Sequence, residues 1–403
     1  MSFINKKALI LFIILYCCIS LQSFAFADTA ASRITLQTVR SNVLKEDRKI
    51  HIYTPLNMKK DEAYPVLYLL DGDAHIALAA GQVQYLSEAY KIIPSLIIVA
   101  IENTDRVRDL TPTHWSIGAD GKPDTSKNAF GRNSGAADKF LQFMKKELMP
   151  YIESKYPTAP YRILSGHSLG GLLGIHSILN HPGLFNAVIA ISPSLQWDSE
   201  LMIAQASQKI DPKQFSNTQL FFSDANEGPV FHKNQIRLDS ILKAKNVPAT
   251  SYRYMHYPEE SHTSEPVKAF YDGLKHIYPD WHLPYNNSAF KKSMSAKIIK
   301  DHFAALSAKY GYKIKPLHDE INQISRFLRN DPNRVKDAIE LLEMNAEHYP
   351  SSAVVYEHLG DTYVKAADMP KAAASFQKAL QLDASNGQLK QKAASLNANS
   401  LKQ

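Results

Sequence analysis

Between Thr35 and His276, short segments rich in β-branched and aromatic residues alternate with stretches of helical periodicity. The first two alternate apolar and polar residues, as antiparallel edge strands do, whereas most later ones are continuously apolar, as buried parallel strands are. The expected strands are Thr35–Val39, Ile50–Tyr53, Val66–Leu70, Leu96–Ile101, Arg162–Leu164, Val188–Ile191, Leu220–Phe222 and Ser251–Tyr254. The clearest helix is expected over 136–155. This alternation predicts an α/β domain with a doubly wound, mostly parallel sheet.

The alternation of strand-like and helical segments ends at about Tyr278. The next segment, 279–295, contains two prolines and the run Asn286-Asn287-Ser288, so we predict a linker there. Residues 296–403 have helical periodicity and many alanines. The sequence therefore predicts an α/β domain over 28–278, followed after the linker by a small all-α helical-repeat domain.

The C-terminal segment carries one clear helical repeat. The residues 355–363, followed at fixed spacing by Ala372, Phe376 and Ala379, resemble the tetratricopeptide repeat. In that repeat, small side chains let two helices cross closely while aromatic side chains fill the groove between them. A degenerate copy precedes it by 34 residues. An ordinary helical hairpin is the alternative.

The first 27 residues have the organisation of a secretory signal peptide. Lys6 and Lys7 precede the apolar run Ala8–Ile19, which is too short for a comfortable membrane span, and the run is followed by Ala25-Phe26-Ala27. We therefore expect cleavage near Ala27 and export to the periplasm or the medium. An uncleaved amphipathic anchor is the alternative.

Both cysteines, Cys17 and Cys18, lie within this segment, so thiol enzymes, disulfides and cysteine metal sites are not expected in the mature chain. Hydrophobic residues at 45% and charged residues at 21% exclude extensive disorder. The formal charge of +7 is spread along the chain, so we expect no nucleic-acid partner. We also expect no cofactor, no catalytic metal and, after cleavage, no integral membrane span.

The most informative motif is Gly166-His167-Ser168-Leu169-Gly170, which follows an expected strand and opens an expected helix. In this context, a G-x-S-x-G sequence places the serine on a sharp turn with its hydroxyl exposed. The flanking glycines remove side chains that would collide in the bend. The backbone N–H of Leu169 can then face a developing oxyanion. Ser168 is therefore the candidate nucleophile, with a purely structural turn as the alternative.

A serine nucleophile needs a general base, because its hydroxyl is scarcely ionised near neutral pH. His262 lies in the loop after the last expected strand, where the base belongs if the order is serine, acid, histidine. The acid should follow the strand 220–222, where the chain offers both Asp224 and Glu227. We favour Glu227 for its reach and its place in the loop proper. Asp224 and a dyad without an acid remain alternatives.

Two further segments bear on the site. The second oxyanion donor should come from the loop after strand 66–70, where Gly72 allows the backbone to turn toward the serine and the N–H of Asp73 is our candidate. A plain turn is the alternative. Arg106 and Arg108 follow the strand 96–101 and could favour an anionic substrate, although a surface salt-bridge cluster is the stronger interpretation.

Four sequence blocks together resemble the putative esterase family of α/β hydrolases. They are Leu69–Asp73, Gly166–Gly171, Ser192–Asp198 and Glu260–His262. The family includes esterase D-like enzymes, enterochelin and salmochelin esterases and bacterial mycolyltransferases. The resemblance covers about Thr35 to Tyr278, and it does not extend to the C-terminal helices.

This resemblance implies an α/β-hydrolase fold and a serine carboxylesterase with Ser168 as nucleophile and His262 as base. It also implies that the loop after Gly72 contributes to the oxyanion hole. The family acid is Asp or Glu, and some siderophore esterases work with Ser and His alone. The Ser192–Asp198 block lines the cleft in similar proteins, so Trp197 is a candidate substrate wall, with core packing as the alternative.

The expected function is a serine carboxylic-ester hydrolase that acts through an acyl-enzyme on an exported or imported small-molecule ester. Siderophore esters are one candidate substrate class. An acyltransferase would use the same residues with a sugar or lipid alcohol in place of water. A third alternative is an interaction protein whose C-terminal helices bind a protein partner or mediate self-association.

Overall fold

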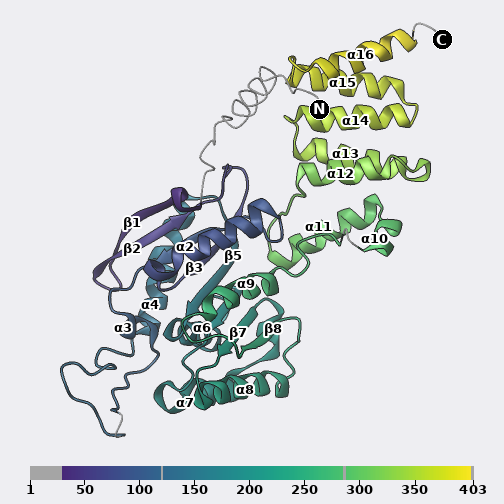
Figure 1. Ribbon diagram of the computed structural model, residues 1–403. Coiled ribbons are helices and arrows are strands. Elements are labelled where there is room, and N and C mark those ends of the chain that lie inside the picture. Colours follow the sequence, from purple (N-terminus) through teal and green to yellow (C-terminus); the bar gives the residue numbers. More distant parts are fainter. Residues whose placement is uncertain (1–29, 119–120, 285–286, 401–403) are drawn as a thin grey trace, which may run out of the picture. The chain divides into compact units, whose positions relative to one another are not determined.

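The structure is a computed structural model that describes residues 30–118, 121–284 and 287–400 (Figure 1). It divides into two compact units, one up to Pro279 and one from Asp280 onward. The expected signal peptide, residues 1–27, lies outside the described residues. Within the described ranges, no helix is both long and apolar enough to cross a membrane.

The first unit is built on one eight-stranded sheet in the order β1-β2-β4-β3-β5-β6-β7-β8. β1 and β2 are antiparallel to each other, β2 is antiparallel to β4, and all other neighbours are parallel. The strands are β1 Ile34–Ser41, β2 Glu46–Tyr53, β3 Tyr64–Leu69, β4 Ile97–Ile101, β5 Thr158–His167, β6 Ala187–Ile191, β7 Gln219–Ala225 and β8 Tyr252–Tyr257. Each expected strand is present, which confirms the predicted α/β fold class.

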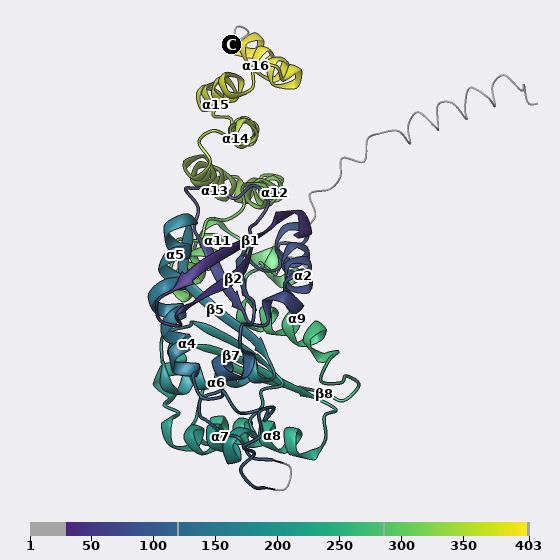
Figure 2. The same cartoon turned by 90° about the vertical axis from the view of Figure 1, so that its left-hand side faces the viewer.

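Helices cover both faces of this sheet. α2 and α9 lie on one face and pack on each other, and α4, α5, α6, α7 and α8 lie on the other (Figure 2). The α-helices are α2 Gly72–Val83, α3 Arg106–Leu110, α4 Ala137–Phe143, α5 Met149–Lys155, α6 Leu169–Asn180, α7 Trp197–Lys209, α8 Pro229–Ala244 and α9 Glu265–Ile277. The shorter elements are the 3₁₀ turns η1 Ala30–Arg33 and η4 Pro212–Ser216 and the π-helical turns η2 Gln84–Ala89 and η3 Met144–Leu148.

The helix expected over 136–155 forms in three parts, α4, η3 and α5, because its middle turn widens to a π-helix.

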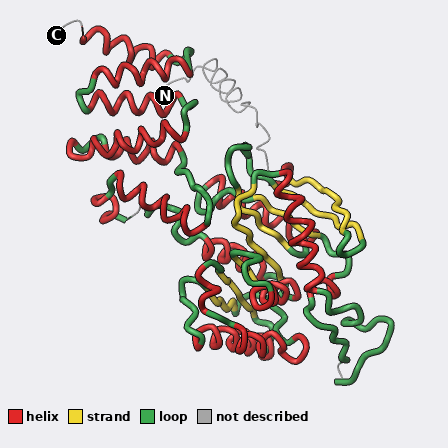
Figure 3. The backbone as a smooth tube through the Cα atoms, turned by 180° about the vertical axis from the view of Figure 1, so that it is seen from behind, coloured by secondary structure: helices red, strands yellow, loops and turns green. Residues whose placement is uncertain are grey.

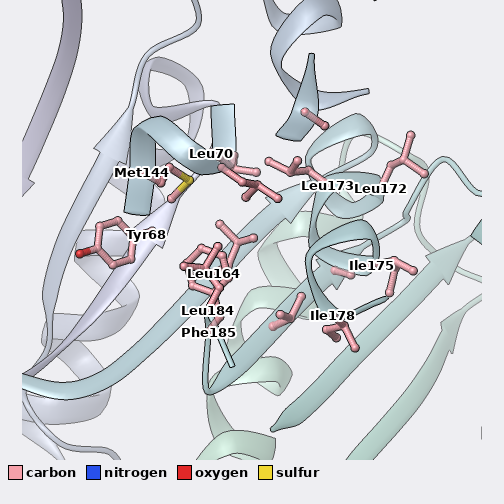
Figure 4. Close-up of a cluster of buried hydrophobic side chains, with 14 of the residues drawn as sticks. Tyr68, Leu70, Met144, Leu164, Leu172, Leu173, Ile175, Ile178, Leu184 and Phe185 are labelled. Atoms are coloured by element: carbon pink, nitrogen blue, oxygen red, sulfur yellow. The ribbon is translucent and has the colours of Figure 1, made fainter. Parts of the chain in front are cut away.

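Helix α6 lies at the centre of the core. Every residue from Leu169 to Leu179 is buried, so the helix lacks the polar face of a surface helix. Its leucines and isoleucines meet Leu164 of β5 and Tyr68 of β3 in one apolar cluster (Figure 4). Since a buried helix of this kind is held on all sides, the turn that precedes it at Ser168 is held in place by the core.

The second unit consists of helices and loops (Figure 3). Its elements are α10 Ser288–Ser293, α11 Ala296–Tyr310, α12 His318–Leu328, η5 Pro332–Arg334, α13 Val335–His348, α14 Ala353–Lys365, α15 Met369–Leu382 and α16 Gly387–Ser400. The segment that we expected to be a linker, 279–295, contains α10, and its Leu283 and Met294 are buried.

Helices α14 and α15 cross closely at a glycine. A Cβ atom on Gly360 would lie 2.7 Å from the ring of Phe376, so no larger residue fits without displacing that ring. The hydroxyl of Tyr363 donates to Glu343 of α13 at 2.6 Å, so α14 is joined to α13 as well as packed against α15. This packing is the kind expected of the repeat pattern, and the tetratricopeptide assignment stays a prediction.

Candidate active site

Ser168 occupies the predicted sharp turn between β5 and α6. Its backbone has φ 61° and ψ −114°, a conformation that costs a non-glycine residue about 1–3 kcal/mol. Its N–H donates to the carbonyl of Ile191 at 2.9 Å, which holds the turn against β6. A Cβ atom on Gly166 would lie 2.6 Å from the backbone of Gly170, so the turn closes only because Gly166 is a glycine. The expected strand–turn–helix arrangement is therefore present.

The loops after β7 and β8 bring Glu227 and His262 together. The Nδ1 atom of His262 lies 2.8 Å from Oε2 of Glu227, and the Glu227 side chain is only 4% exposed. The His262 ring lies 4.3 Å, centroid to centroid, from the ring of His167, the residue directly before Ser168. With Nδ1 hydrogen-bonded to a carboxylate, Nε2 is the nitrogen left to exchange a proton.

The charge of Glu227 is maintained despite its burial. Burial alone would raise its pKa, but hydrogen bonds from His262 and Ser192 lower it below the ordinary value. Glu227 is therefore ionised at neutral pH. A buried carboxylate in this state stabilises a positive charge on His262.

Two serines of the loop after β6 complete this arrangement, and we did not predict either of them individually. Ser192, at φ 41°, donates its hydroxyl to both carboxylate oxygens of Glu227, at 2.5 and 2.6 Å. The Ser194 hydroxyl lies 3.2 Å from that of Ser168. The signal available in the sequence was two small hydroxyl residues directly after the strand that neighbours β5 in the sheet.

The two expected oxyanion donors lie in the first turns of helices. Leu169 is the first residue of α6 and Asp73 the second of α2, and N–H groups in a first turn have no acceptor within their helix. Our reason for Gly72 was wrong. The left-handed residue is Asp71, at φ 53°, whereas a Cβ atom on Gly72 would lie 2.6 Å from the backbone of Ala100 in β4. Gly72 is required by this close approach.

A model of the family described as putative esterase matches residues 41–252, which is more than half of the chain. The chain belongs to the putative esterase family. This result confirms the family resemblance, and the match contains three of the four sequence blocks, whereas Glu260–His262 lies beyond it.

Several curated relatives of this chain are named for siderophore chemistry. The siderophore triacetylfusarinine C esterase of Aspergillus fumigatus is 30% identical over 157 residues, 38% of this chain and 52% of that protein. The ferri-bacillibactin esterase BesA of Bacillus subtilis is 30% identical over 171 residues, 39% of this chain and 58% of its own length. The chain thus spans between half and two thirds of these two relatives.

The fold of the chain also matches solved structures. An IroE-like serine hydrolase from Shewanella oneidensis is 29% identical with a TM-score of 0.64, over 78% of this chain and 99% of that one. An uncharacterised protein from Capnocytophaga ochracea, 18% identical, gives a TM-score of 0.65 over 91% of this chain and 99% of its own. The second match shows a likeness of fold alone.

The remaining predicted site residues have other partners in the structure. Asp224 is fully buried, and its carboxylate contacts His232, Tyr254 and His256 in place of His262. The structure therefore pairs Glu227 with the candidate base and places Asp224 in a separate cluster.

The two arginines form ion pairs. Arg106 binds the carboxylate of Asp71 through two nitrogens, at 2.7 and 3.0 Å, and also donates to the carbonyl of His167. It thereby joins the loop that carries Asp73, the candidate second oxyanion donor, to the serine turn. Arg108 binds Glu46 and Asp109, each at 2.7 Å. Both arginines are thus paired with carboxylates, as the salt-bridge interpretation predicts.

Trp197 is only 5% exposed. Its ring packs edge-on against Trp115, with centroids 5.4 Å apart, and its Nε1 donates to Thr113. The core-packing alternative therefore describes this side chain better than a substrate wall.

A small apolar pocket adjoins the serine turn and is bordered by two further histidines. Leu69, Leu78 and Phe270 are among its lining residues, together with His75 and His167. Burial, reinforced by the charges of His262 and His75, lowers the pKa of His167 to about 4. His167 is therefore neutral at pH 7 and places no second positive charge beside the imidazolium that His262 would form.

A buried acid behind the site gives a pH-dependent contribution to stability. Glu265, the first residue of α9, has no exposed surface, and its burial, with the charge of Glu227 adding to the effect, raises its pKa to about 9. Its ordinary value is 4.5. Between these values the native state holds one proton more than the unfolded state. The free energy of unfolding therefore falls as pH rises, by up to about 1.4 kcal/mol per pH unit from this group.

We predict that Glu265→Gln removes this dependence. Urea unfolding at intervals from pH 5 to pH 9 should show the variant gaining stability relative to the parent protein as pH rises. The control is Glu259→Gln, which changes a 57%-exposed side chain in the preceding loop and should keep a constant difference from the parent. A constant difference for Glu265→Gln as well would contradict the assignment of a protonated Glu265.

Proposed function

We propose that this protein hydrolyses carboxylic esters through an acyl-enzyme formed on Ser168. The observation that carries the proposal is the 2.8 Å hydrogen bond between His262 and Glu227, formed beside a strained serine turn at the carboxyl edge of the sheet. These are the parts that acyl transfer requires: a nucleophile, a base and a group that orients the base.

In the proposed reaction, the Ser168 hydroxyl oxygen attacks the ester carbonyl carbon while Nε2 of His262 accepts its proton. The N–H groups of Leu169 and Asp73 receive the oxyanion, and each good donor contributes on the order of 3–4 kcal/mol to transition-state stabilisation. His262 then gives the proton to the leaving alcohol. Water repeats the sequence on the acyl-enzyme, which releases the acid and restores the serine.

We further propose that the substrate is an ester-linked siderophore and that the protein acts after export. The names of the Aspergillus and Bacillus relatives support the substrate class. The basic, apolar and Ala-x-Ala segments of residues 1–27 support export.

The test of the substrate class is a comparison of kcat/KM between triacetylfusarinine C and p-nitrophenyl butyrate on the purified protein. We expect a value at least about tenfold higher for the siderophore, because contacts with the rest of a cognate substrate add transition-state binding. A siderophore hydrolysed more slowly than the simple ester would contradict the substrate class while leaving the esterase activity intact.

The same assay separates hydrolysis from acyl transfer. With an added sugar or lipid alcohol, the proposal predicts free acid as the main product. A new ester as the main product would instead identify an acyltransferase.

A further inference from the structure

A second group of chemically capable side chains lies at the same edge of the sheet as the candidate active site. Asp224 of β7 is the register partner of His256 on β8, so their side chains leave the sheet on the same face. His232 comes from the first turn of α8, which packs against β7. Three elements thus bring one carboxylate and two imidazoles together, and their candidate ligand atoms all lie within 4.8 Å of one another.

The geometry of this group is well defined. The Nδ1 atom of His232 lies 2.8 Å from Oδ2 of Asp224, and the Nδ1 atom of His256 lies 3.0 Å from Oδ1. The hydroxyl of Tyr254 donates to the same Oδ1 at 2.7 Å. The carboxylate is fully buried, whereas the His232 and His256 side chains are 40% and 34% exposed. The group therefore consists of a buried carboxylate that is held by hydrogen bonds and two imidazoles that solvent can reach.

Two imidazoles and a carboxylate are ligands that suit a divalent transition-metal ion such as Zn²⁺. Ligand atoms at about 2.0–2.1 Å from a tetrahedral ion are about 3.4 Å apart, so each imidazole nitrogen needs to move only about half an ångström from the carboxylate oxygen that it contacts. The tautomer also permits binding. Each ring can move its proton from Nδ1 to Nε2 on its exposed side, and the hydrogen bond from Tyr254 then orients the carboxylate.

A second cluster, Asp138 with His176 and His181, provides a contrast. There both histidines approach the same carboxylate oxygen at 2.7 Å, and the Asp138 side chain is 60% exposed. The Nδ1 atom of His176 also lies 3.0 Å from the amide nitrogen of Asn180, whose own oxygen accepts from Lys209. This amide fixes Nε2 of His176 as a proton donor to Asp138. Metal binding there would break that arrangement.

We propose that Asp224, His232 and His256 form a binding site for a divalent transition-metal ion, for which Zn²⁺ is the appropriate probe. The ion would connect the carboxyl ends of β7 and β8 to the start of α8. The loop that carries Glu227 joins β7 to α8, so two of the three ligands would flank that loop in the sequence. The site is separate from the Ser168 chemistry, in which none of its three residues takes part.

The test is isothermal titration of the purified, tag-free protein with ZnCl₂ at pH 7.5. The parent protein should bind one Zn²⁺ with a micromolar or lower Kd. The double variant His232→Ala/His256→Ala should bind at least about 100-fold more weakly, beyond the roughly 10–100-fold loss that removing an outer-shell partner causes. Because both side chains are partly exposed, the variant should fold and keep the esterase activity of the metal-free parent.

Two controls assign the site. The variants Asp138→Asn/His181→Ala and His262→Ala should each bind Zn²⁺ as the parent does. The proposal is overturned if the parent shows no binding up to millimolar Zn²⁺, or if binding survives in His232→Ala/His256→Ala. It is equally overturned if either control variant abolishes binding, because the ion would then belong to another cluster.

Discussion

Replacing Ser168 with alanine should lower kcat for p-nitrophenyl butyrate by a factor on the order of 10⁴ to 10⁶, without loss of the folded state. The alanine removes the only atom that the mechanism makes covalent with the substrate, while the oxyanion donors and the pocket remain. The variant should in addition be at least as stable as the parent, since the turn keeps its backbone contacts. Steady-state kinetics and a circular dichroism melt check both expectations.

The matched control for this prediction is Ser194→Ala. The Ser194 hydroxyl is 3.2 Å from that of Ser168, so it is the neighbouring oxygen that could be mistaken for the nucleophile. Its loss should change kcat by no more than about tenfold, the range of one neutral hydrogen bond. A greater loss in Ser194→Ala than in Ser168→Ala would contradict the assignment.

The second large effect concerns the acid. Glu227→Gln should lower kcat by a factor on the order of 10³ to 10⁴, because an amide can donate to Nδ1 of His262 and so stabilise the wrong tautomer. Asp224→Asn should leave kcat within about tenfold of the parent, since Asp224 contacts other side chains. Both variants are compared at a temperature at which circular dichroism shows them folded.

This comparison separates the two carboxylates that the sequence offered. A larger loss of kcat in Asp224→Asn would reassign the acid. Equal and small losses in both variants would indicate a Ser–His dyad that works without an orienting carboxylate.

The strands of the sheet and the serine turn could be predicted because each of these elements depends on residues that are close together in the sequence. Alternating and continuous apolar runs located each strand of the eight-stranded sheet that the structure describes, and the strand-to-helix context of Gly166-His167-Ser168 located the turn. The position of His262 followed from the order of the loops along the sheet. These features follow from the periodicity of apolar residues and from the order of segments along the chain, and both can be read from a single sequence.

Other features depended on contacts between distant segments, and the sequence could not reveal them. One partner of Arg108 is Glu46, 62 residues away. The choice between Glu227 and Asp224 depends on how one loop turns after β7. The role of Gly72 depends on how closely it approaches a neighbouring strand.

The same reason explains why residue spacing indicated no metal motif. The ligands of the proposed Zn²⁺ site come from β7, α8 and β8, and the register of the two strands together with the packing of α8 against β7 brings them together.

The most direct test of the account is covalent labelling with diisopropyl fluorophosphate, followed by intact mass and peptide mapping. The account predicts a single adduct on the peptide that contains Ser168, formed at least about 100-fold more slowly in His262→Ala, because general-base assistance is worth about 10²–10⁴. An adduct on another residue, or labelling whose rate does not depend on His262, would contradict the proposed nucleophile and base.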